Sequence, residues 1–87
     1  MVSLHCVMTI DVLLFASYAD AAGAERVRVT LPEGARVAAL VEAVRLAAPA
    51  IVLPSRPLVA VNHRYAAMDL VIADGDEVAL IPPVAGG

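Results

Sequence analysis

The chain is 87 residues long with a mass of 9.0 kDa, which is the size of one domain. Its net charge is −3, and its six basic residues are all arginines scattered along the sequence. Nucleic-acid binding requires clustered positive charge and usually stacking aromatic side chains, but only 3% of these residues are aromatic. Composition therefore argues against nucleic acid as a partner.

Apolar residues make up 61% of the chain and the mean hydropathy is +0.83, whereas an ordinary soluble domain is about 45–50% apolar. A domain of this size has a small core, so part of the surplus must lie on the surface. Contiguous exposed apolar patches usually mark a site for a partner. We therefore expect a docking surface.

Cysteine and histidine are too sparse for a disulfide or a metal site. Cys6 is the only cysteine, so no internal disulfide is possible. A zinc site needs several ligands at suitable spacing, but His5 and Cys6 stand near the start and His63 stands apart. Only His5 could serve Cys6 as a base, so a cysteine nucleophile is not predicted.

The hydrophobic stretch Leu4–Ala16, with Ala19-Asp20-Ala21 after it, has some features of a signal peptide. No basic residue precedes the stretch, and Asp11 interrupts it, which argues against that interpretation. The stretch is also too short to span a bilayer. We expect a cytoplasmic protein with no membrane segment.

In the first third of the chain we expect an N-terminal extension and two strands joined by a short helical turn. Met1–Val7 is interpreted as an addition to the domain, and Met8 is a possible alternative start. Thr9–Ala16 is dense in branched apolar residues, which favours a central strand. Ser17 is expected to cap a short helical turn that Gly23 closes. The next strand has one wet face, since apolar and polar residues alternate over Glu25–Leu31.

One amphipathic helix is predicted over Arg36–Ala48. Its apolar residues fall at helical spacing and should face the core: Val37, Leu40, Val41, Val44 and Ala48. Pro49 ends the helix, and no Ser, Thr, Asp or Asn stands at its start, so its N-terminal cap is weak. Leu46 points away from the apolar stripe.

The rest of the chain predicts three more strands separated by turns. Leu58–Val61 is the third strand, and Tyr65-Ala66 is a possible short return strand after the turn at Asn62-His63-Arg64. Asp74-Gly75-Asp76 is a strong turn signal before the last strand, Glu77–Ile81. One helix across such a mixed sheet gives a two-layer α+β domain. His63 and the carboxylates of Asp74, Asp76 and Glu77 are expected to be solvated rather than catalytic.

The last six residues are Pro82-Pro83-Val84-Ala85-Gly86-Gly87. The proline pair should stop the last strand and extend the chain outward. Six extended residues reach roughly 20 Å, enough to carry the Gly87 carboxylate into a partner's active site. The alternative is a frayed terminus without a role.

These motifs together resemble the MoaD family, the small sulfur-carrying subunits of molybdopterin synthase, over about Met8 to Gly87. The aspartate turn and the terminal Gly-Gly are each weakly specific, but their combination with the proline pair is strongly specific. Met1–Val7 and Arg36, where relatives often place a capping Thr or Ser, depart from the family. The motifs that carry the resemblance are Leu13-Leu14-Phe15-Ala16, the alternating second strand, Ala60-Val61-Asn62, Asp74-Gly75-Asp76-Glu77-Val78 and the last six residues.

The resemblance implies a ubiquitin-like β-grasp domain over residues 8–81, with a mixed sheet of about five strands, preceded by residues 1–7 and followed by the tail 82–87. It implies that a MoeB-type adenylating enzyme uses ATP to convert the Gly87 carboxylate into an acyl-adenylate, which is then converted into a thiocarboxylate. Gly86 would keep the approach to Gly87 sterically open. The thiocarboxylate would donate sulfur to cyclic pyranopterin monophosphate in the large catalytic subunit of molybdopterin synthase, within a heterotetramer. The chain itself would bind no cofactor or metal and would not be catalytic alone.

The resemblance also indicates where a partner docks. In a β-grasp fold the first and last strands are parallel neighbours, so Phe15 and Ile81 should lie together beside the tail. Tyr65 matches a third apolar position of the family's partner-facing patch. We expect these three residues to form a docking surface that the tail residues Pro82, Pro83, Val84 and Ala85 continue; the alternative is that the three are ordinary core.

Three other functions stay open. A sulfur carrier for another pathway, such as thiazole synthesis, usually lacks the Pro-Pro-Val element in its tail. A ubiquitin-like modifier would be joined to target lysines through Gly87, although without lysine the chain could not be extended on its own side chains. A plain interaction domain would have a tail with no role.

Overall fold

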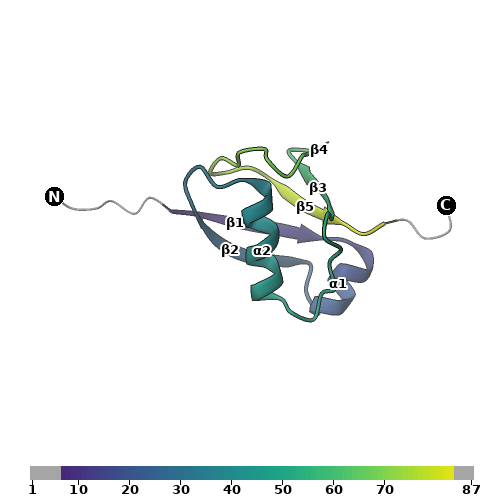
Figure 1. Ribbon diagram of the computed structural model, residues 1–87. Helices are drawn as coiled ribbons and strands as arrows, with labels where there is room; N and C mark the ends of the chain where they lie inside the picture. Colours follow the sequence, from purple (N-terminus) through teal and green to yellow (C-terminus); the bar gives the residue numbers. More distant parts are fainter. Residues whose placement is uncertain (1–6, 84–87) are drawn as a thin grey trace.

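The computed structural model describes residues 7–83 and contains a five-stranded mixed sheet with two helices (Figure 1). The sheet order is β2-β1-β5-β3-β4. β1 pairs in parallel with β5, and the other neighbouring pairs are antiparallel. The strands are β1 (Val7–Leu14), β2 (Arg26–Pro32), β3 (Leu58–Val61), β4 (Arg64–Tyr65) and β5 (Val78–Ile81).

Alternation along the strands separates a buried face from an open face. In β1 every second residue is buried, whereas Thr9 and Asp11 on the other face are exposed. β2 alternates in the same way, with Val29 and Leu31 buried and Arg28 exposed. The alternation predicted for Glu25–Leu31 is confirmed, and β1 follows the same rule. The buried residues of β1 are Met8, Ile10, Val12 and Leu14.

Helix α2 (Val37–Ala47) lies across the buried face of the sheet (Figure 1). Its predicted apolar stripe is confirmed, because Val37, Leu40, Val41 and Val44 are all at most 2% exposed. Leu46 lies on the opposite side and is 84% exposed, also as predicted. One main helix packed on a mixed sheet with parallel first and last strands is the β-grasp arrangement, so the expected α+β fold is confirmed.

The predicted weakness of the α2 N-terminal cap is confirmed, and the backbone of a distant loop compensates for it. Arg36 is the cap residue and makes no side-chain capping bond. Instead the Val37 N–H donates to the Leu70 carbonyl and the Ala38 N–H to the Met68 carbonyl, both at 2.9 Å. These bonds satisfy two of the donors that a helix start leaves free. The Arg36 Nη1 also donates to the Asp69 carbonyl at 2.8 Å, which ties the same loop to the helix.

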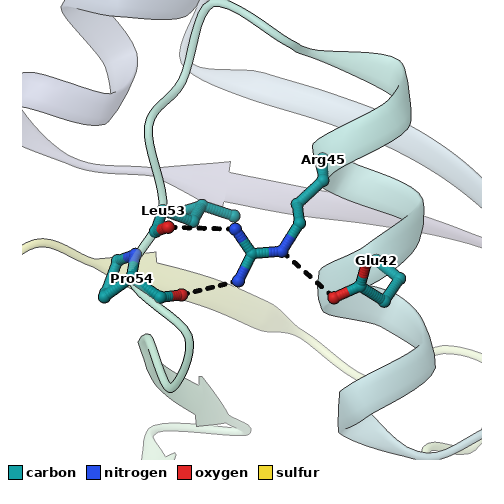
Figure 2. A network of polar contacts seen from close by, with 4 residues as sticks. All are labelled: Glu42, Arg45, Leu53 and Pro54. Atoms are coloured by element: carbon teal, nitrogen blue, oxygen red, sulfur yellow. Dashed lines mark hydrogen bonds and ion pairs between the residues drawn. The ribbon is translucent and has the colours of Figure 1, made fainter.

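The other end of α2 is held to the connection that follows it. Figure 2 shows the Arg45 guanidinium donating to the carbonyls of Leu53 and Pro54, at 2.9 and 2.6 Å, and to the Glu42 carboxylate at 3.1 Å. Ile51 and Leu53 of this connection are buried in the core. Arg45 therefore fixes an irregular segment that contributes Ile51 and Leu53 to the core.

The predicted boundaries around helix α1 (Ala16–Ala22) need correction. Ser17 is not its cap but lies inside the first turn, because the helix begins at Ala16 directly after the extended residue Phe15. For the same reason β1 ends at Leu14 rather than at Ala16. The predicted end is confirmed, since Gly23 closes the helix at a left-handed φ of 70° that glycine adopts readily.

β3 and β4 form a hairpin with a two-residue turn. Asn62 and His63 have φ angles of 53° and 71°, the two positive values of a type I′ hairpin turn. β4 is short and pairs only with β3. Within residues 7–83 neither helix is long and apolar enough to cross a membrane.

Candidate docking surface at the C-terminal end of the sheet

Four apolar residues form a row across the open face of the sheet. Leu13 of β1 pairs with Ala79 of β5, Ala79 with Ala60 of β3, and Ala60 with Tyr65 of β4. Directly paired residues point to the same face of a sheet. The two alanines are the floor of the row, with exposed fractions of 8–9%, and the Tyr65 side chain is 72% exposed at its edge.

A second apolar row lies next to the first, toward the C-terminal end of β5. Ile81 pairs with Leu58, and Phe15 follows β1 at the level of Ile81, because Leu14 pairs with Leu80. Phe15 is 47% exposed and Leu58 is 45% exposed. The first row lines a shallow hollow of about 330 Å³ together with Phe15 and Ile81 of the second row, and His63 and Glu77 close it on the polar side. We call this area the apolar face: Leu13, Phe15, Leu58, Ala60, Tyr65, Ala79 and Ile81.

All three residues predicted for docking lie on the apolar face. Phe15 and Tyr65 are exposed and Ile81 is half-buried, so the alternative that they are ordinary core does not describe their environment. Leu58 was missed. Alternation shows that Leu58 shares a face with Ala60, but only the register with β5 shows which face that is.

A charged row borders the apolar face on the side away from the tail. The Arg28 Nε donates to Asp11 at 2.8 Å, and this bond holds the pKa of the Asp11 carboxyl below its usual value. His63 Nε2 lies 3.2 Å from Glu77 Oε1. Both pairs are largely exposed, so neither contributes much to stability. A partner lying over the apolar face would therefore meet charge at this border.

The polar residues predicted to be solvated are indeed at the surface. His63, Asp74 and Glu77 are exposed, and Asp76 is half-buried and accepts hydrogen bonds from the Ala73 N–H and from Asn62 Nδ2. Among the described residues no group of three or more His, Cys, Asp or Glu side chains could hold a metal ion.

The C-terminal segment continues from β5 at the apolar face. β5 ends at Ile81, followed by a half-buried Pro82 and an exposed Pro83, as the proline pair predicts. Ile81 belongs to the second apolar row, so the chain leaves the sheet beside Phe15 and Leu58. The predicted site residues Val84, Ala85, Gly86 and Gly87 lie outside the described residues, and their roles stay predictions.

The β-grasp sheet, its single crossing helix and an apolar open face at the end of β5 define a protein of the ubiquitin-like class. The family model of the ThiS family matches residues 12–87. Because this match covers most of the chain, the protein belongs to the ThiS family. It is a ubiquitin-like sulfur carrier of the MoaD/ThiS type.

Solved structures of similar sequence agree with this assignment. SAMP1 from Haloferax volcanii is 35% identical with a TM-score of 0.79, over 91% of this chain and 99% of that one. A second structure of the H. volcanii small archaeal modifier protein 1 is 34% identical with a TM-score of 0.78, over 88% and 99% of the two chains. A Pyrococcus furiosus protein assigned as molybdopterin converting factor, subunit 1, is 32% identical with a TM-score of 0.76, over 88% and 99%.

Proposed function

We propose that this chain is the sulfur-carrier subunit of molybdopterin synthase and works in the cytoplasm. The observation that carries the proposal is the apolar face at the end of β5, from which the segment Pro82-Pro83-Val84-Ala85-Gly86-Gly87 continues. A partner that binds this face would have the C-terminal segment of the chain start at a fixed position in its binding site, next to Ile81. The likeness to a molybdopterin converting factor subunit supports this pathway.

Activation of the carrier takes place at the Gly87 carboxylate. A carboxylate is a poor acyl donor because its oxygen is a poor leaving group. An adenylating enzyme of the MoeB type would let this oxygen attack the α-phosphorus of ATP, with pyrophosphate leaving. Sulfur at the oxidation level of sulfide, such as hydrosulfide, would then attack the acyl carbon, so that a C–S bond forms, AMP leaves as the C–O bond breaks, and loss of the S–H proton gives a thiocarboxylate.

Sulfur transfer needs a second partner, which we propose to be the large catalytic subunit of the synthase. That subunit would hold cyclic pyranopterin monophosphate and accept the thiocarboxylate of Gly87 in its active site. Both partners would bind Phe15, Tyr65 and Ile81, since these side chains line one hollow and Ile81 directly precedes the tail. This chain supplies the reactive end, and the catalytic side chains and ATP site belong to the partners.

A protein modifier is the second candidate function. Two structures of a small archaeal modifier protein share 34–35% identity with this chain, slightly more than the converting factor subunit does. In that case the activated Gly87 would form an amide bond with a target lysine instead of receiving sulfur. A sulfur carrier for thiazole synthesis has less support, because the Pro-Pro-Val element is uncommon in those tails.

The intact mass of the chain purified after coexpression with its adenylating enzyme tests the central chemistry. The expected result is the replacement of one oxygen by sulfur at Gly87, followed by loss of that sulfur when the large subunit and cyclic pyranopterin monophosphate are added. Covalent adducts that survive denaturation, without sulfur transfer, would support the modifier. An unaltered mass and no adducts would contradict both.

A further inference from the structure

Two turns at the charged border of the apolar face are joined by side chains, although they are far apart in the sequence. One is the β3–β4 turn at Asn62 and His63, and the other is the turn Asp74-Gly75-Asp76 before β5. Asn62 and Asp76 are among the residues that carry the family resemblance. Sulfur chemistry at Gly87 makes no use of either side chain, so their place in the fold needs another reason.

Asn62 uses both polar atoms of its amide group. Its Nδ2 donates to Asp76 Oδ1 at 3.0 Å, and its Oδ1 accepts the Glu77 N–H at 3.0 Å. The backbone N–H of Asn62 also donates to the Glu77 carbonyl at 2.7 Å. The second carboxylate oxygen of Asp76 accepts the Ala73 N–H at 2.8 Å. One amide and one carboxylate therefore link both turns, an arrangement we call the Asn62–Asp76 clamp.

Few residues could replace asparagine at this place. The φ angle of 53° at position 62 lies in the left-handed region, which Gly and, less readily, Asn or Asp adopt. Gly has no side chain to form the clamp. Asp could accept the Glu77 N–H but would place a second carboxylate against Asp76. Asparagine alone combines the backbone conformation with a donor and an acceptor.

The clamp lies between the two parts of the apolar face that a partner must meet together. On one side is the hairpin, whose short strand β4 carries Tyr65 and pairs only with β3. On the other side is Glu77, directly before β5, which carries Ala79 and Ile81. A two-residue strand is weakly held by its own ladder, so the clamp supplies bonds that fix the hairpin tip against the start of β5.

We propose that Asn62 and Asp76 are positioning residues for partner binding: they hold the β3–β4 turn against the start of β5, and so fix the hairpin that carries Tyr65. This inference rests on the proposed function, in which the apolar face binds the adenylating enzyme. Without the hydrogen bonds of the clamp, the domain stays folded, but β4 separates from β3 more often. Binding then costs more, because the hairpin must be ordered when the partner docks.

Three variants separate the clamp from the general effects of substitution. Asn62→Gly keeps the left-handed backbone and removes the side-chain bonds. Asn62→Asp keeps the acceptor for Glu77 but opposes two carboxylates. The double variant N62D/D76N exchanges the two side chains. Its carboxylate at position 62 still accepts the Glu77 N–H, while its amide at position 76 accepts the Ala73 N–H and donates back to that carboxylate. The double variant should therefore restore what N62D loses.

The first measurement needs no partner. The Ala66 N–H donates to the Val59 carbonyl at 2.8 Å at the far end of the hairpin, so its hydrogen exchange reports hairpin opening. We expect exchange at Ala66 to be roughly tenfold faster in Asn62→Gly than in the natural sequence, and to return toward the natural rate in N62D/D76N. Unchanged exchange at Ala66 in Asn62→Gly would overturn the clamp.

The second measurement is ATP–pyrophosphate exchange with the adenylating enzyme. In Asn62→Gly and Asn62→Asp the KM for the carrier should rise roughly tenfold with kcat unchanged, and N62D/D76N should recover most of the loss. Ile10→Val is the matched control, because it removes one methyl group from the core on the helix side. A KM in Asn62→Gly equal to that of Ile10→Val would overturn the role in binding.

The two measurements also keep this inference apart from the proposed function. If the natural sequence supports no exchange reaction with the adenylating enzyme, the proposed function fails, while hydrogen exchange at Ala66 still decides whether the clamp holds the hairpin. If the natural sequence reacts and Ala66 and KM do not respond to Asn62→Gly, the proposed function stands and the clamp is wrong.

Discussion

The two faces of the sheet differ in the size and exposure of their apolar side chains, although both result from the alternation of residues along the strands. On the helix-covered face Ile10, Val12 and Leu80 are at most 1% exposed and fill the space beneath α2. On the open face small alanines lie in the middle and large side chains stand at the rim, where Phe15 and Tyr65 are 47% and 72% exposed. A domain that buried every apolar residue would have no such rim. The contrast indicates that one face holds the fold together and the other is kept for a partner.

In the proposed function the reacting group is the Gly87 carboxylate and not a side chain of either face, so removal of Gly87 should have the largest functional effect and no effect on the fold. We expect complete loss of sulfur transfer, because the shortened chain ends in the Gly86 carboxylate, which falls about 3.3 Å short of the place where a partner would receive Gly87. Thermal unfolding should be unchanged, and activity assays with both partners measure the loss. An active variant without Gly87 would leave the plain interaction domain as the remaining function.

A charge on the open face should abolish partner binding while the domain stays folded. Phe15→Asp and Ile81→Asp each place a carboxylate in the second apolar row, which a partner would have to desolvate. Co-purification with the large subunit measures binding, and circular dichroism measures the fold. Thr30→Asp, which is also exposed but lies outside the apolar face, is the matched control. Unfolding of either apolar-face variant would show that its residue belongs to the core.

Truncation on the helix-covered face should do the reverse. Leu40→Ala removes a side chain that is fully buried beneath the sheet, and such changes cost about 2–5 kcal/mol of unfolding free energy. That is a large part of the about 5–15 kcal/mol that stabilises a typical domain. Denaturant unfolding measures the loss. At a temperature where the variant is still folded, binding to the large subunit should equal that of the natural sequence; weaker binding would break the separation of the two faces.

Tyr18 of α1 offers the smallest effect and a test by pH. Its hydroxyl is buried without a hydrogen-bond partner among the described residues. Burial raises the pKa of this hydroxyl above its ordinary value of 10.0, and the positive charge of Arg45 opposes the rise. Tyr18→Phe removes an unsatisfied polar group, so stability at neutral pH should be unchanged or higher by up to about 1 kcal/mol.

The pH dependence follows from the direction of that shift. A raised pKa means that the folded state holds the proton more tightly, so the stability linked to it is fully present below pH 10 and is lost as pH rises through the folded pKa. The natural sequence should therefore lose stability above pH 10 more steeply than Tyr18→Phe does, as measured by denaturant unfolding at several pH values. Equal slopes would show that Tyr18 ionises in the folded state as freely as in the unfolded one.

Much of the fold could be predicted because its signals are local. Alternation over Glu25–Leu31 and the helical spacing from Val37 to Val44 report directly which side chains are buried, since burial follows the geometry of each element. Errors arose where an element ends. Ser17 is a good cap by residue type, yet the cap is Phe15, directly after β1, so the helix begins two residues earlier than a Ser17 cap would set it.

The candidate site could be predicted in part. Phe15 and Ile81 lie on neighbouring parallel strands, so knowledge of the fold was sufficient to place them together. Leu58 needed the register of β3 against β5, which pairs it with Ile81. The contact between Asn62 and Asp76 had no signal in the composition of either turn, because each residue is also a common turn former on its own.

The sequence by itself determined the buried and wet faces of the second strand, the apolar stripe of the helix and the Pro-Pro-Val-Ala-Gly-Gly end, because each depends on the order of neighbouring residues. Only the tertiary structure decided which open-face residues share a row, how the start of α2 is capped by the carbonyls of Met68 and Leu70, and that Asn62 meets Asp76 across 14 residues. Those contacts depend on strand register and loop closure, which are settled when the whole core packs and not by any single segment.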